Sequence, residues 1–136
     1  MIRVLVLLLL LLPRTALSEV IVNSDVSIDK VSRHYLLSVF SMRARTWPDG
    51  KAVRVFILPP YQPPHKKFVK QELGLFPYQL IKIWDRAVFS GAGQSPIVVA
   101  NHREMLERVK STAGAIGYIQ DPKFQGGDDV KVLQVD

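Results

Sequence analysis

The chain has 136 residues and no cysteine, which excludes disulfides, thiolate metal sites, thiol nucleophiles and a lipid-modified N-terminal cysteine. Lysine and arginine outnumber the acidic residues by 18 to 12, a mild excess that ordinary solubility explains as well as attraction of anions does. The aromatic residues do not alternate with lysine and arginine on any one element, so no nucleic-acid surface is predicted.

Residues Met1–Ser18 have the pattern of a cleavable secretion signal. Arg3 precedes the apolar run Val4–Leu12, and small residues stand just before Glu19. This run is much shorter than the roughly 20 apolar residues of a membrane-spanning helix. We therefore expect cleavage after Ser18, a mature chain without a membrane anchor, one domain over residues 19–136 and a location outside the cytoplasm.

Strand and helix patterns alternate along the mature chain, which predicts an α/β fold with a mixed β-sheet flanked by helices. Glu19–Asn23 is a β-branched run typical of a strand. A helix is expected from the N-cap Ser27 to about Phe40, because four apolar residues follow at helical spacing; they are Ile28, Val31, Tyr35 and Val39. The strand pattern Val53–Leu58 comes next and is stopped by two prolines.

The second half of the chain continues the alternation. Pro63 begins a helix that Gly74 ends, and Pro77 begins another. The second of these helices is predicted to bury one apolar face, made of Leu80, Ile81, Trp84 and Val88. The remaining expected elements are a strand at Pro96–Ala100, a helix capped by Asn101, a strand at Ala115–Ile119 and an edge strand at Val130–Val135.

No enzyme, metal or cofactor signature is found. His34, His65 and His102 lie on different predicted elements without carboxylates at ligand spacing. No serine has a histidine and an aspartate in a hydrolase arrangement. We therefore predict a non-enzymatic protein with no catalytic residue, no metal ligand and no cofactor.

One basic cluster is a candidate anion site. His65, Lys66 and Lys67 fall in the first turn of a predicted helix directly after Gln62, where unpaired N–H groups attract anions. Arg43 and Arg45 in a neighbouring loop are added to this candidate ligand-binding set. The alternative is a solvated basic surface, because the two prolines of that turn have no N–H to offer.

Two aromatic residues are candidates for contact with a protein partner. Tyr61 lies in the rigid, proline-rich stretch Leu58–Pro64, which suits a partner contact. Trp47 lies in a polar loop before a turn, where packing of the loop against the body is the competing interpretation.

The ordered motifs resemble a known family. The stretches that carry the resemblance are Ser27–Val31, Thr46–Gly50, Phe89–Pro96 behind Trp84, and Thr112–Ile119 with its Gly-Ala-Ile-Gly-Tyr run. They resemble the phosphate-binding branch of the periplasmic substrate-binding proteins of ABC transporters. The resemblance implies one lobe of a type II periplasmic binding protein, a periplasmic location in a bacterium and a role in binding phosphate or another small anion.

Two departures from the family limit what it implies. Its full members have two lobes that close on the ligand, whereas the mature chain here has the length of about one. Phosphate binders also carry an Arg-x-Asp-x-Ser-Gly-Thr loop after the central strand, and here the positions of its Arg, Asp, Ser and Thr hold Leu58, Pro60, Gln62 and Pro64. We therefore expect binding of a small anion or other small ligand without the usual phosphate loop. The alternative is an interaction or structural module of a bacterial envelope complex.

Overall fold

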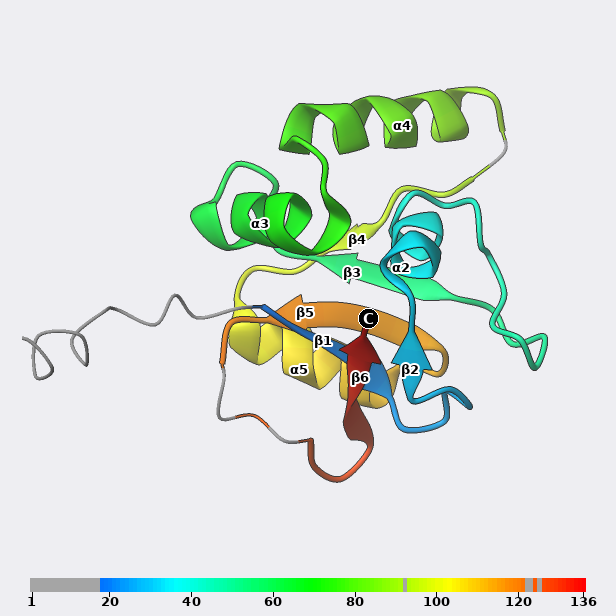
Figure 1. Cartoon of the computed structure of the whole chain (residues 1–136), viewed down its shortest axis with the longest axis vertical. Helices are drawn as coiled ribbons and strands as arrows, with labels where there is room; N and C mark the ends of the chain where they lie inside the picture. The colour runs from blue at the N-terminus through cyan, green and yellow to red at the C-terminus, as the bar shows by residue number, and fades with distance from the viewer. Residues whose placement is uncertain (1–17, 92, 122–123, 125) are drawn as a thin grey trace, which may run out of the picture.

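A computed structural model describes residues 18–91, 93–121, 124 and 126–136 (Figure 1). The predicted secretion segment lies outside this part, except for its last residue. A six-stranded sheet in the order β2-β6-β1-β5-β3-β4 forms the centre of the molecule. Its strands are β1 (Glu19–Asn23), β2 (Lys30–Val31), β3 (Arg54–Ile57), β4 (Ile97–Val98), β5 (Ala115–Ile119) and β6 (Val130–Val135).

The sheet is mixed, as the sequence predicts. β1 runs antiparallel to both of its neighbours, with Val20 opposite Tyr118 of β5 and Leu133 of β6. β3 runs parallel to β4 and β5, and β2 runs parallel to β6. The carboxyl ends of β3 and β4 therefore lie at the same edge of the sheet, and the proline-rich loop after β3 leaves from that edge.

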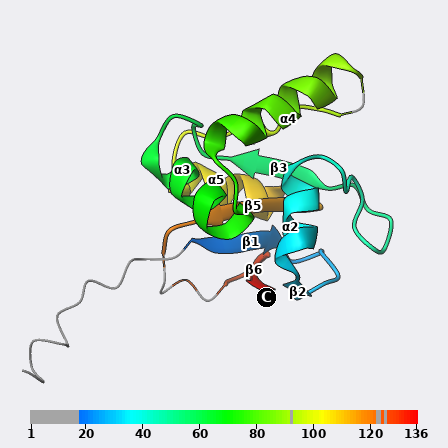
Figure 2. The same cartoon turned by 45° about the horizontal axis from the view of Figure 1, so that its top comes forward.

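Helices cover both faces of the sheet. They are α2 (Arg33–Phe40), α3 (Pro63–Phe68), which continues as the π-helical turn η2 (Val69–Leu73), α4 (Pro77–Phe89) and α5 (His102–Ser111). Successive residues of β5 face opposite sides, so Gly117 lies beneath Met105 of α5 while Tyr118 contacts α2 and α3. α4 lies furthest from the sheet in both views (Figures 1 and 2).

An aromatic cluster fills the core between the sheet and α2, α3 and α4. The Phe68 and Tyr118 rings stack at 3.8 Å, and Phe40 packs on Phe68 at 4.9 Å. Trp84 of α4 is buried, as the sequence predicts, and its Nε1 donates to the carbonyl oxygen of Phe40 at 2.6 Å. This bond joins α4 to the end of α2.

The first helix begins later than the sequence predicts. Ser32, not Ser27, is its N-cap, and its hydroxyl accepts a hydrogen bond from the Tyr35 N–H at 3.1 Å. Lys30 and Val31 instead pair in parallel with the last strand. Strand pairing with a distant segment thus overrides the helical spacing, although the predicted end at Phe40 is confirmed.

Two further predictions about exposure are wrong. β6 is not an edge strand, because the short β2 covers its outer side. On α4, Leu80 and Trp84 are buried but Ile81 and Val88 are 37% and 43% exposed. The core therefore covers only part of the predicted apolar stripe of this helix.

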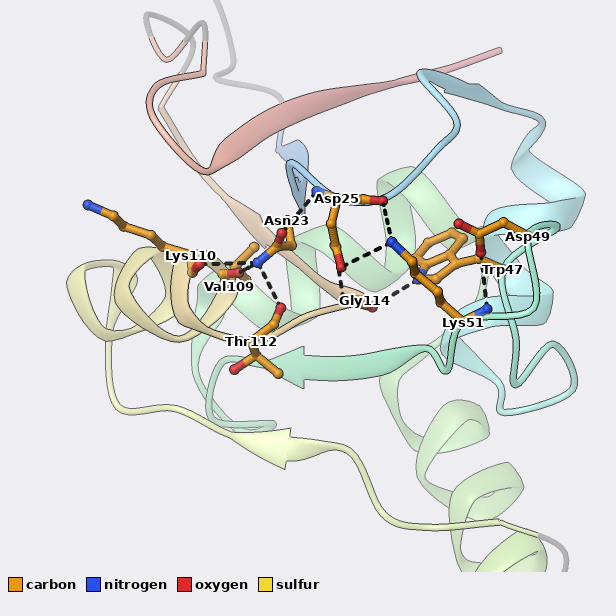
Figure 3. Close-up of polar contacts among 9 residues, drawn as sticks. All are labelled: Asn23, Asp25, Trp47, Asp49, Lys51, Val109, Lys110, Thr112 and Gly114. Carbon is orange, nitrogen blue, oxygen red and sulfur yellow. Dashed lines mark hydrogen bonds and ion pairs between the residues drawn. The ribbon is translucent and has the colours of Figure 1, made fainter.

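A polar cluster holds three separate segments together beside the sheet (Figure 3). The Asn23 side-chain amide donates to three carbonyl oxygens near the end of α5; they belong to Val109, Lys110 and Thr112. The Asn23 side-chain oxygen accepts from the Asp25 N–H at 3.0 Å. Because the last carbonyls of a helix lack partners within it, Asn23 stabilises the end of α5.

The same cluster fixes the backbone of Gly114. Its N–H donates to the Asp25 carboxylate at 3.1 Å, and its carbonyl accepts from Trp47 Nε1 at 2.9 Å. Gly114 has φ +71°, and a Cβ there would lie 2.1 Å from the Ala52 carbonyl oxygen. Only glycine fits this position, for both reasons.

Candidate functional site

The predicted basic cluster lies at the start of α3, at the carboxyl edge of the sheet. Gln62 is its N-cap residue but makes no side-chain capping bond, and the next two positions are prolines. Tyr61, Gln62 and Lys66 are exposed and Lys67 is partly buried. With six residues and two prolines, this helix offers few free N–H groups to an anion.

His65 does not belong to that surface, which corrects the prediction. Its side chain is fully buried, between Tyr118 and Trp84. The Tyr118 hydroxyl accepts from the Leu58 N–H at 2.9 Å and forms a second hydrogen bond of 2.6 Å with Nδ1 of His65. Burial lowers the pKa of His65 to about 4, which keeps the ring neutral at pH 7.

Trp47 is also in the core, so the predicted partner contact is wrong for this residue. Only 2% of it is exposed, and its one polar atom is bonded to Gly114. The competing interpretation, packing of the loop against the body, is correct. Tyr61 is 78% exposed and remains available to a partner.

Arg43 and Arg45 lie elsewhere, in a groove at the opposite end of β3 from the proline-rich loop. They stand on the segment that follows α2 and line two adjoining cavities. Arg54, the first residue of β3, lines the first cavity, and Arg86 of α4 lines the second. We call these four residues, Arg43, Arg45, Arg54 and Arg86, the arginine groove.

The backbone around the arginine groove is tied in place on both sides. The Arg43 and Ala44 N–H groups both donate to the Ser38 carbonyl at 2.9 Å, which folds this segment back on α2. The Gly93 N–H donates to the Ala87 carbonyl at 3.1 Å and folds the following loop back on α4. A Cβ on Gly93 would lie 3.7 Å from Nη2 of Arg45, so this loop forms one wall of the groove.

The charge of the groove is not neutralised by carboxylates. Among the described residues, no aspartate or glutamate lines either cavity, and none forms an ion pair with the four arginines. The C-terminal ends of α2 and α4 border the second cavity at Ser41 and Ser90. Their partial negative charge stabilises guanidinium groups there, which helps to explain how the cluster is tolerated.

Sequence reasoning found half of the groove. Arg43 and Arg45 were identified because they stand together in a polar loop, whereas Arg54 and Arg86 lie on a strand and a helix that the sequence assigns to the core. No spacing in the sequence relates these four residues. The structure joins the two pairs and separates them from Gln62, Lys66 and Lys67 at the other end of β3.

Other kinds of site receive no support from the described part of the chain. No group of three or more histidine, aspartate or glutamate side chains is arranged there to hold a metal ion. None of the described helices is long and apolar enough to cross a membrane.

Comparison with known proteins gives similarity at the level of structure. No protein-family model and no curated protein matches the chain. Among solved structures, PstS of Borrelia burgdorferi superposes with a TM-score of 0.64 at 16% identity, over 88% of this chain and 47% of the other. This chain has the fold of about half of a phosphate-transport binding protein.

Two further structures support the same conclusion. An ABC-type phosphate transport receptor of Vibrio cholerae has a TM-score of 0.62 at 13% identity, covering 90% of this chain and 48% of its own. A Clostridium perfringens protein described as a phosphate ABC transporter substrate-binding protein, solved with bound phosphate, has a TM-score of 0.65 at 13% identity. The superposition covers 88% of this chain and 44% of the Clostridium perfringens chain.

The resemblance seen in the sequence is thus confirmed for the fold. The similar structures are binding proteins rather than enzymes. This chain spans less than half the length of each.

Proposed function

We propose that the protein is a non-enzymatic, exported protein that binds small anions in the arginine groove. The observation that carries the proposal is the gathering of four arginines around two cavities to which the described residues contribute no carboxylate. Guanidinium groups bind phosphate and carboxylate through paired N–H donors, and unpaired ones are the more available for this.

The fold supports a binding role of this kind. The similar solved structures are described as phosphate binding proteins and receptors of phosphate transport. Because the chain spans less than half of each, phosphate capture and coupling to an ABC transporter are proposals for this protein.

The proline-rich loop is the less suitable surface for an anion. The resemblance implies that the phosphate loop belongs there, but Pro59, Pro60, Pro63 and Pro64 provide no N–H. Lys66, which is exposed, and Lys67, which is partly buried, remain beside it. We therefore assign anion binding to the groove and use Lys66 as the control.

Isothermal titration calorimetry at low ionic strength tests the proposal, with phosphate and sulfate added to residues 19–136. We expect heat of binding and a rise in melting temperature, both lost in Arg45→Gln because Arg45 lines both cavities. Lys66→Gln removes the same charge at the other end of β3 and should bind normally. Failure of the folded wild-type protein to bind these two anions, hexyl phosphate and hexane-1,6-diyl bisphosphate would falsify the proposal.

A second function is favoured by the exposed aromatic residues. Tyr61, Phe76, Tyr78 and Phe89 are 78%, 56%, 57% and 96% exposed. Such residues are typical anchors of protein interfaces, so the domain can also be proposed as an interaction module of an envelope complex. Affinity purification from periplasm discriminates the two functions: a stoichiometric partner that Tyr61→Ala releases supports the module, and a monomer that retains small anions supports the binder.

A further inference from the structure

The arginine groove has two centres of positive charge. The two cavities share Met42 and Arg45, while Arg54 lines only the first and Arg43 and Arg86 line only the second. Arg45 therefore stands between one arginine on β3 and two near the ends of α2 and α4. This distribution differs from a single pocket in which all the cations converge on one point.

The size of the groove also exceeds that needed by one inorganic anion. The cavities have volumes of about 480 and 410 Å³, each within the roughly 300–1,000 Å³ of pockets that hold organic ligands. A single phosphate in the first cavity would leave most of the space, and the arginines of the second cavity, without a ligand group.

Apolar side chains line both cavities beside the arginines. Ala52, Val53 and Val55 line the first cavity, and Ile83 and Ala87 line the second. Apolar walls favour a ligand with a carbon framework, because burial of that framework adds to the electrostatic attraction. Charged groups of a ligand are thus suited to the arginines of the two cavities, and an uncharged spacer to the apolar side chains that line them.

We propose that the groove takes an elongated organic anion that carries two phosphate or carboxylate groups, one bound by Arg54 with Arg45 and the other by Arg43 with Arg86. This ligand class rests on the anion-binding function proposed above and makes it more specific. Each end is recognised by the planar guanidinium group, whose paired N–H donors can bond two oxygens of a phosphate or a carboxylate.

A matched pair of probes tests the requirement for two charged groups. Hexane-1,6-diyl bisphosphate and hexyl phosphate share the six-carbon chain and differ only in the second phosphate. In calorimetry at low ionic strength we expect the bisphosphate to bind at least about tenfold more tightly, because its second group binds as part of the same molecule. Equal affinities after correction for the statistical factor of two would overturn the proposal of two subsites.

Single substitutions locate the two ends. Arg54→Gln and Arg86→Gln should each reduce bisphosphate affinity toward that of the monophosphate, and Arg45→Gln should weaken both probes. Lys66→Gln is the charge-matched control and should leave both affinities unchanged. Circular dichroism of each variant establishes that it is folded before its affinity is interpreted.

The outcomes separate this inference from the proposed function. Binding of both probes with similar affinity, lost in Arg45→Gln, would keep the anion site and overturn the two-ended ligand. Equal loss in Lys66→Gln and Arg45→Gln would show non-specific attraction and overturn both. Failure of the folded protein to bind either probe, phosphate or sulfate overturns both as well.

Discussion

Trp47 Nε1 donates a hydrogen bond of 2.9 Å to the carbonyl oxygen of Gly114, although the two residues are 67 positions apart in the chain. This bond joins two of the stretches that carry the family resemblance, Thr46–Gly50 and Thr112–Ile119. Both stretches therefore hold the fold together. They report on the architecture of the protein and say little about its ligand.

Substitution Trp47→Phe should test this interpretation. The phenyl ring keeps much of the packing but leaves the buried Gly114 carbonyl without its donor, so we expect a loss of about 1–3 kcal/mol in the free energy of unfolding. Urea denaturation measures it, with Tyr61→Ala as an exposed control expected to change stability by less than about 0.5 kcal/mol. An unchanged Trp47→Phe would show that the bond contributes nothing to stability.

Gly114→Ala should be far more damaging than Gly50→Ala. Both glycines have positive φ, +71° and +89°, but only at Gly114 would the added Cβ meet backbone, at 2.1 Å. We expect a loss of about 4 kcal/mol or more, or failure to fold, for Gly114→Ala and about 1–2 kcal/mol for Gly50→Ala. Thermal melts of the two variants compare them directly, and similar melting temperatures would contradict the structure.

Asn23→Ala should destabilise the end of α5. The substitution leaves three carbonyl oxygens, at 2.9 to 3.1 Å from the present amide, without that donor. We expect a loss of about 2–3 kcal/mol and faster amide hydrogen exchange in the last turn of α5. Ser111→Ala, which removes an exposed bond within the same helix, is the control and should cost little.

His65 should make the stability of the protein depend on pH. The pKa of His65 is lowered to about 4 in the folded state from an ordinary value of 6.5. As the pH falls, His65 is therefore protonated in the unfolded chain at a higher pH than in the folded protein. The contribution of His65 to the free energy of unfolding should be fully present above about pH 6.5. It should fall by about 3 kcal/mol as the pH approaches 4.

Comparison with His65→Leu isolates this contribution. Burial raises the pKa of the Glu19 and Glu72 carboxyls, which acts in the opposite direction, so only the difference between the two proteins is informative. Urea midpoints between pH 4 and 7 should fall more steeply for the wild type. Parallel curves would show that His65 is protonated without cost in the folded protein.

Export is the remaining prediction, and it concerns residues 1–18. Intact mass and N-terminal sequencing of the protein from a bacterial periplasm should show a chain that begins at Glu19. A chain retained in the membrane fraction with Met1 in place would contradict the predicted cleavage.

The sequence predicts most of the architecture because several elements carry local signals. Asn101 caps α5 through the Glu104 N–H at 2.9 Å, and Gly74 ends η2 with φ +68°. These contacts involve residues close together in the chain, so their pattern can be recognised without tertiary information.

What the sequence could not predict depends on contacts between distant residues. Lys30–Val31 forms a strand only because Gln134 and Val135 pair with it. This pairing takes residues from the start of the predicted helix. His65 has the charge pattern of a surface turn, yet Tyr118 and Trp84 enclose it. The arginine groove likewise requires the tertiary fold, because its four members come from three separate parts of the chain.

The position of β6 affects the order in which the sheet can assemble. β1 pairs only with β5 and β6, so Val20 finds its partners at Tyr118 and Leu133. Contacts this remote slow folding, since a long loop must close before they form. A newly made chain would thus stay unfolded for longer than one whose strands pair with near neighbours in the sequence. That delay would favour passage through a secretion channel that accepts unfolded polypeptides.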